Sequence, residues 1–314
     1  MNSTSLLNRR TILMAAAAGA SATLLQACGG SDDHPRNIVE VAQANPDLSI
    51  LVEAVVAAGL TPTLSTGNLT VFAPTNAAFA ALLTELGVTK AALLADKALL
   101  TAVLTYHVLG TAVPRASVPV GKAITPVGGG FFKVEAAGSG LRITDGRNRT
   151  SNITATDIQA SNGVVHVVDK VLLPADKNIV ATASALPDFS ILVEAVVAAG
   201  LVPTLQGTGP FTVFAPTNAA FAALLTELGI TKEALLANKP LLTSVLTYHV
   251  VPSRVLKADV PVNTPITTVQ GQKFTVNASL AITDSRGRQS SIVTTDVFTS
   301  NGVIHVVNKV ILPS

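Results

Sequence analysis

The chain has 314 residues, more than one ordinary domain requires, which favours two domains. Hydrophobic residues make up 48% and charged residues 13%, which excludes disordered, collagen-like and highly charged proteins. The formal net charge is +2, and Arg9 and Arg10 account for the whole excess, so the remaining chain has no overall field to attract DNA, RNA or an anionic membrane. We therefore expect no nucleic-acid partner.

The first 27 residues have the pattern of a secretory signal peptide. Arg9 and Arg10 precede an apolar, alanine-rich stretch over residues 12–25, and small residues follow it. This stretch is shorter than the roughly 20 residues that a membrane-spanning helix needs. The arginine pair is similar to a twin-arginine export signal, although two neighbouring residues depart from that pattern, so Sec export stays open as the alternative.

The only cysteine, Cys28, directly follows this segment, where cleavage would fall. A single thiol cannot form an intramolecular disulfide or a cysteine-based metal site. The position resembles that of the lipidated cysteine of a bacterial lipoprotein, which implies a signal peptide over residues 1–27, lipid on Cys28 and a lipidated tether over residues 28–36. Several acyl chains on one residue would anchor the chain firmly. An ordinary cleaved signal with a chance cysteine is the alternative.

After the tether, the sequence contains one unit that occurs twice. Three blocks recur almost unchanged: residues 47–60 as 188–201, residues 70–90 as 212–232, and residues 161–174 as 300–313. A period of about 140 residues is too long for a solenoid repeat and fits a whole domain. The repeats predict a first domain over residues 37–174 and a second over residues 178–314.

Each unit begins with helical patterns. Asp47 is a suitable N-cap for an apolar helix that stops at Gly59. A β-rich run follows at residues 69–74, and the next helix is predicted over residues 77–86 because apolar side chains recur there at helical spacing. Residues 91–108 are typical of one or two further helices.

The second half of each unit changes to a strand pattern. In the first unit, apolar residues alternate or run together at residues 132–135, 141–144, 152–156 and 164–173. Asp-Gly and Asn-Gly pairs between these runs favour tight turns. Helices followed by strands indicate an α+β fold and not a parallel α/β sheet.

Three segments of each unit resemble the motifs of the fasciclin domain. Residues 70–79 read Thr-Val-Phe-Ala-Pro-Thr-Asn-Ala-Ala-Phe, a Tyr-His pair stands at residues 106–107, and residues 161–169 read Ser-Asn-Gly-Val-Val-His-Val-Val-Asp. The second unit matches at residues 212–221, 248–249 and 300–308, with Asn308 in place of Asp169. The motifs keep their order in both units and cover nearly all of the chain after the signal.

This resemblance implies both a fold and a role. The fold is α+β, with two tandem fasciclin-type domains that are each a β-wedge of about seven strands with packed helices. The role is adhesion between a cell and its matrix or neighbours. It involves no catalysis, so we expect no catalytic residues, no cofactor and no metal.

The resemblance also implies candidate site residues, because the Tyr-His region and an Asp-Ile pair are tied to integrin adhesion in animal members of the family. The matching positions here are Tyr106, His107, Asp157, Ile158, Tyr248, His249 and Asp296. The alternative for the histidines is hydrogen bonding inside the wedge, since buried polar groups need partners. The alternative for Asp157 is a turn or cap residue.

Together these patterns predict a lipid-anchored cell-envelope protein that acts in adhesion or surface association. We expect it to be exported, periplasmic or surface-exposed, and placed in the outer membrane if the host is Gram-negative. Its expected partner is a surface glycan, a protein or a second copy of itself. The alternative is a carrier of a small apolar ligand such as a lipid or carotenoid, and an enzyme is a more distant third.

Partner specificity is expected in the loops that differ between the two units, because loops carry recognition on a rigid scaffold. The differing pairs are residues 61–69 against 202–211 and residues 115–140 against 254–279.

Overall fold

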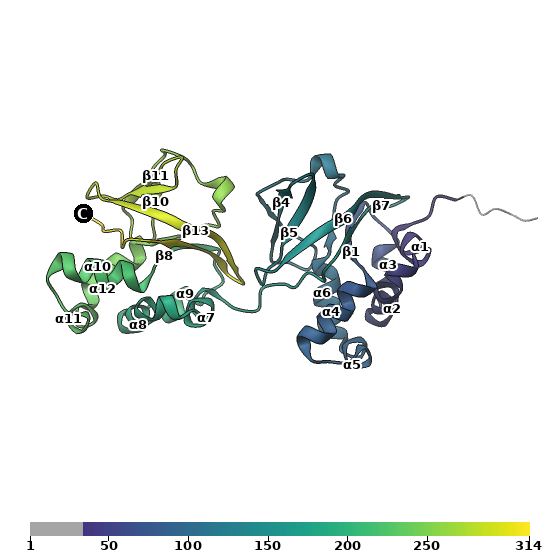
Figure 1. Ribbon diagram of the computed structural model, residues 1–314, viewed down its shortest axis with the longest axis horizontal. Helices are drawn as coiled ribbons and strands as arrows, with labels where there is room; N and C mark the ends of the chain where they lie inside the picture. The colour runs from purple at the N-terminus through teal and green to yellow at the C-terminus, as the bar shows by residue number, and fades with distance from the viewer. Residues whose placement is uncertain (1–33) are drawn as a thin grey trace, which may run out of the picture. The chain divides into compact units, whose positions relative to one another are not determined.

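The structure is a computed structural model that describes residues 34–314, of which residues 35–314 form one compact unit. The candidate export residues Arg9 and Arg10 and the candidate lipidation site Cys28 lie outside the described residues. The same series of elements occurs twice, as the repeated blocks predict, and Figure 1 labels its members along the chain.

The first domain contains six α-helices and seven strands within the described residues. Its helices are α1 Ile38–Gln43, α2 Ser49–Ala58, α3 Thr61–Leu64, α4 Asn76–Leu86, α5 Lys90–Ala95 and α6 Lys97–Tyr106. Its strands are β1 Leu69–Pro74, β2 Val108–Leu109, β3 Ala123–Ile124, β4 Phe132–Ala137, β5 Gly140–Thr144, β6 Thr150–Ala160 and β7 Gly163–Val168.

The second domain repeats this series. Its helices are α7 Ile179–Ser184, α8 Ser190–Ala199, α9 Val202–Leu205, α10 Asn218–Leu228, α11 Lys232–Ala237 and α12 Lys239–Tyr248. Its strands are β8 Phe211–Pro216, β9 Val250–Val251, β10 Ile266–Thr267, β11 Lys273–Val276, β12 Ala281–Thr283, β13 Gln289–Thr299 and β14 Gly302–Val307.

Each domain holds one seven-stranded sheet, in the order β2-β1-β7-β6-β5-β4-β3 in the first domain and the equivalent order in the second. Only β1 with β7 and β8 with β14 are parallel, while the other paired strands are antiparallel. The helices gather along one side of the strands in each domain (Figure 1). The α+β prediction and the seven strands per domain are confirmed.

Local chemistry accounts for most helix ends. Gly59 ends α2 and Gly87 ends α4, both in the left-handed conformation that glycine adopts without a steric penalty. Thr75 caps α4 by accepting a hydrogen bond from the backbone of Ala78. The prediction that Asp47 caps the first long helix is wrong, because Asn45 accepts from the Asp47 backbone and starts a 3₁₀ turn before that helix.

Two apolar cores fill the first domain. One lies between the helices and the sheet and includes Phe79 of α4 and Leu104 of α6. The other includes Phe72 and Phe132, whose rings meet edge to face with centroids 5.3 Å apart. Tyr106 belongs to this second core, so the end of α6 is fixed between the two.

Strand β6 is interrupted by irregular pairing with β7, where the register shifts between Ile153 and Ala155 and again before Ile158. Asp157 lies at this bulge with φ +59°, and Asp296 lies at the equivalent bulge of β13 with φ +61°. A bulge redirects a side chain out of the regular pleat. The fold therefore presents both aspartates in the same special conformation.

Candidate functional site

Tyr106 and His107 lie where α6 ends, and both are buried, with 0% and 1% of their surface exposed. The His107 Nδ1 donates to the Val103 carbonyl at 2.7 Å, since a carbonyl can only accept. The His107 Nε2 accepts from the Leu172 backbone N–H at 2.8 Å. His107 thus ties the end of α6 to the segment that follows β7.

The second domain repeats this arrangement with Tyr248 and His249. Both are buried, and His249 bonds the Val245 carbonyl at 2.8 Å and the Ile311 N–H at 3.1 Å. The Tyr106 hydroxyl donates to the Phe131 carbonyl, and the Tyr248 hydroxyl donates to the carbonyl of Lys273. Neither Tyr-His pair offers a surface that a partner could touch while the domain is folded.

Burial controls the protonation of these pairs. It lowers the pKa of His107 to about 4 and that of His249 to about 4, since charging either ring would remove an ion from water. Burial also raises the pKa of Tyr106 and that of Tyr248. All four side chains are therefore neutral at pH 7.

Asp157 is the exposed member of the candidate set. Its Oδ1 accepts from the Arg115 backbone at 2.8 Å, and its own N–H donates to the His166 Nδ1 at 3.3 Å. The His166 Nε2 in turn lies 3.0 Å from the Val113 carbonyl. Among the described residues, the Asp157 Oδ2 has no hydrogen-bond partner, so this oxygen is held in place and open to solvent. Ile158 is half-buried against the helix-side core.

Asp296 has the same local geometry but a different environment. Its Oδ1 accepts from the Lys257 backbone N–H at 2.8 Å, and its own N–H donates to the His305 Nδ1 at 3.2 Å, as in the first domain. Its Oδ2, however, accepts from the Lys133 Nζ of the first domain at 2.8 Å, and only 3% of its side chain is exposed. Asp296 is therefore already occupied by an internal partner.

Further contacts surround this ion pair. The rings of Phe131 and Phe298 lie 4.7 Å apart between centroids, and the Arg254 guanidinium lies 4.0 Å from the Phe131 centroid. The Asn148 side chain bonds both backbone groups of Phe298, accepting from its N–H at 2.6 Å and donating to its carbonyl at 3.0 Å. The motif comparison missed these residues, and the only signal for them was that the two units differ there.

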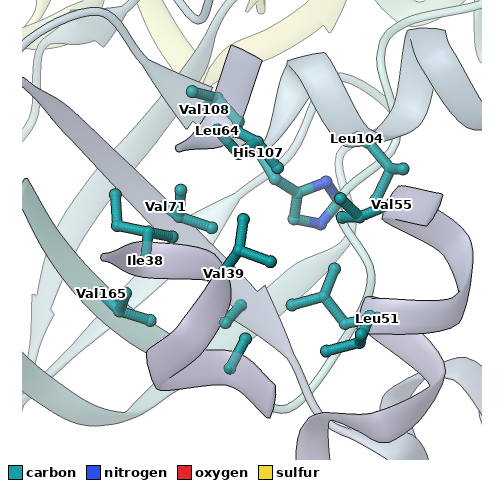
Figure 2. Close-up of a pocket in the computed structure, with 13 residues that line it drawn as sticks. Ile38, Val39, Leu51, Val55, Leu64, Val71, Leu104, His107, Val108 and Val165 are labelled. Atoms are coloured by element: carbon teal, nitrogen blue, oxygen red, sulfur yellow. The ribbon is translucent and has the colours of Figure 1, made fainter. Parts of the chain in front are cut away.

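The structure provides no preformed space for a large apolar ligand at the site shown in Figure 2. His107 lies among Val55, Leu104 and other apolar side chains there, around a pocket of about 30 Å³. The equivalent pocket beside His249 is also about 30 Å³. Such a volume holds about two water molecules, whereas ligand pockets measure roughly 300 Å³ or more.

Within residues 34–314, no cluster of three or more His, Cys, Asp or Glu side chains could hold a metal ion. None of the helices there combines the length and the apolar character that crossing a bilayer requires.

The fasciclin domain model matches residues 46–174 and 187–313. The chain belongs to the fasciclin domain family. Among curated relatives, the Synechocystis protein sll1483 is 41% identical over 150 residues, which cover 47% of this chain and 79% of that protein. This relative matches little more than one fasciclin domain.

Two animal proteins match most of the tandem fasciclin domains. Human periostin is 28% identical over 289 residues, covering 90% of this chain and 32% of periostin. Pig transforming growth factor-beta-induced protein ig-h3 is 29% identical over 283 residues, covering 90% of this chain and 38% of that protein. The chain thus spans only about a third of the length of each of these two relatives.

A solved fasciclin domain pair from the insect cell adhesion molecule fasciclin I also aligns with the chain. It covers 86% of this chain and 98% of the insect chain, with 18% identity and a TM-score of 0.44.

Proposed function

We propose that this fasciclin-family protein mediates adhesion or surface association without catalysis, held at the cell envelope by lipid on Cys28. The observation that carries the adhesive part is Asp157, an exposed carboxylate fixed by the Arg115 and His166 hydrogen bonds with its Oδ2 open to solvent. A preorganised acceptor loses little conformational entropy on binding. The partner is a surface glycan or protein that presents a hydrogen-bond donor or a cation.

The other candidate side chains cannot contact a partner while the protein is folded. The two Tyr-His pairs are buried, and Asp296 is paired with Lys133. Asp157, with the half-buried Ile158 beside it, is the candidate carboxylate that a partner can reach.

The test of adhesion is Asp157→Asn. Asparagine retains an oxygen for the Arg115 N–H and tolerates the left-handed backbone, so the fold should persist. A hydrogen bond to a charged group contributes about 1.5–3 kcal/mol, so we expect binding to the target surface to weaken about tenfold. Attachment of cells that display the protein measures this effect.

Asp47→Asn is the matched control, because Asp47 is an exposed aspartate on the helical side of the same domain. Equal attachment by cells carrying either variant would exclude Asp157 as the contact residue.

The test of anchoring is Cys28→Ser, which removes the thiol that would carry the lipid. We expect the protein to move from the membrane fraction to the soluble fraction of the host, because several acyl chains bind a bilayer firmly and the polar tether does not. Incorporation of labelled palmitate should disappear in parallel. Membrane association that survives in the serine variant would show that something other than Cys28 holds the protein there.

A further inference from the structure

The contact between the two fasciclin domains joins different faces of the two copies. We name the first-domain side, formed by Phe131, Lys133 and Asn148, the lysine face. We name the second-domain side, formed by Arg254, Leu256, Asp296 and Phe298, the aspartate face. Lys133 and Asp296 bond at 2.8 Å, and Phe131 and Phe298 share an apolar cluster with Leu256. The apolar residues and the ion pair at the centre of the contact are buried: Phe131 and Lys133 are 3% and 7% exposed, and Leu256 and Phe298 are 0% and 1% exposed.

A contact that joins two different faces is heterologous. When every unit carries both faces, one such contact leaves a free face of each type, so further units can add at either end. Each domain carries an equivalent of both faces, so the first domain has a second, unused aspartate face and the second domain has an unused lysine face. Unless those faces are altered, the same contact would join one chain to the next and build a filament.

The unused aspartate face can be located by matching hydrogen bonds. The Thr70 hydroxyl accepts from Val113, and the Thr212 hydroxyl accepts from Val255, so Ala112 stands where Arg254 does. By the same register Pro114 replaces Leu256. Strand pairing places Gln159 opposite Val164 and Phe298 opposite Val303, so Gln159 replaces Phe298. Only Asp157 is retained, and the arginine and the apolar anchors are missing.

The unused lysine face is altered as well. Phe132 and Phe274 occupy equivalent strand positions, paired with Ile124 and Ile266, which puts Lys273 in the place of Phe131. The next outward position has Thr275 in place of Lys133. Lys273 puts a charged side chain where Phe131 packs against Phe298, so the apolar part of the contact is missing from this face as well.

The turn that carries Asn148 also differs between the two domains. Asp145 accepts from the backbones of Arg147 and Arg149, and Asp284 accepts from those of Arg286 and Arg288. Gly287 therefore stands where Asn148 does and offers no side chain to bond a partner strand.

We propose that the lysine face and the aspartate face are a matched pair that locks the two domains of one chain together, and that the substitutions on the two unused faces keep this contact from joining chain to chain. The protein is then a monomer in which the two domains recognise each other. Many of the differences between the two units serve this internal recognition, including those within residues 115–140 and 254–279, where partner specificity was expected.

Restoring the unused faces tests the proposal. One variant carries Ala112→Arg, Pro114→Leu and Gln159→Phe, and the other carries Lys273→Phe, Thr275→Lys and Gly287→Asn. We expect the wild type and each variant alone to sediment as monomers, because each chain's original faces are occupied internally. An equimolar mixture of the two variants should form a 1:1 dimer.

The matched control replaces Thr275→Lys with Thr275→Asp, which opposes a carboxylate to Asp157 and should abolish the dimer. A mixture that stays monomeric while both variants keep the native circular dichroism would overturn the proposal. Concentration-dependent chains of the wild type would overturn it too.

A single change tests the lock in the otherwise unaltered chain. Lys133→Glu places two carboxylates together at the buried contact with Asp296, so the domains should separate and the linker at residues 175–177 should be cleaved by protease at least tenfold faster. Lys97→Glu, an exposed change at the start of α6 on the helical side of the same domain, should leave the cleavage rate as in the wild type. Equal cleavage of both variants would show that the faces do not hold the domains together.

Discussion

Acidification from pH 6.5 to pH 4 should destabilise the folded protein by roughly 1 kcal/mol per pH unit for each of His107 and His249. Both histidines have a pKa of about 4 when folded and an ordinary value of 6.5. In this window the unfolded chain binds more protons than the folded chain, so stability is full above pH 6.5 and falls as the pH falls. Each domain holds one of the two histidines and should lose on the order of 2.5 kcal/mol, a large fraction of the roughly 5–15 kcal/mol that stabilises a typical domain.

The physical cause is specific to each ring. Protonation would place a hydrogen on the His107 Nε2, which accepts from the Leu172 N–H, so two donors would oppose each other inside the core. Burial also lowers the pKa of His305, which adds to the same trend. Urea unfolding at a series of pH values measures the slope.

The matched variant is His107→Gln combined with His249→Gln. Glutamine can donate and accept but does not titrate, so the variant should lose stability at pH 7 and show a flatter profile between pH 4 and 6.5. An unchanged slope in this variant would assign the acid sensitivity to other groups.

Gly163→Ala should destabilise the first domain by on the order of 4 kcal/mol or more. Gly163 begins β7 opposite Leu69, and an added Cβ would lie 1.9 Å from the Leu69 carbonyl oxygen. Backbone on the neighbouring strand cannot move away without breaking the pairing of β1 with β7 in the middle of the sheet. Thermal unfolding measured by circular dichroism tests this.

Gly302→Ala in the second domain is the internal replicate, because its Cβ would lie 2.1 Å from the Phe211 carbonyl. Gly87→Ala is the control for conformation alone. It also has a positive φ, of +65°, but an added Cβ meets nothing within 4 Å, so the cost should be only about 1–2 kcal/mol. Similar losses at Gly87 and Gly163 would contradict the steric explanation.

Much of the fold could be predicted from the sequence because its determinants are local. Gly59 and Gly87 end helices through their own backbone freedom, and Thr75 caps the helix that directly follows it by accepting from the Ala78 backbone. Asp47 misled the prediction because the competing cap, Asn45, starts a short 3₁₀ turn just upstream. Where two local signals compete, the sequence alone does not rank them.

The site could be predicted less well from the sequence, because its features depend on residues far apart in sequence. The sequence marks the Tyr-His pairs and Asp157 but does not state which of them reaches the surface. Exposure of Asp157 and burial of Asp296 follow from one contact with Lys133, a residue 163 positions from Asp296. No local sequence pattern predicts that contact. The two equivalent aspartates were therefore given the same prediction, although they occupy different environments.

The strand order determines when the sheet of the first domain can be completed during synthesis. Strand β7 is the last strand of the first domain to be made, yet it lies inside the sheet, between β1 and β6. Its pairing with β1 joins Thr70 to Val164, so the closing of a long loop must precede the contacts that reward it. The sheet of a growing chain cannot be completed until that last strand has been synthesised. A chain that ends before β7 therefore lacks the strand that joins β1 and β2 to the rest of the sheet.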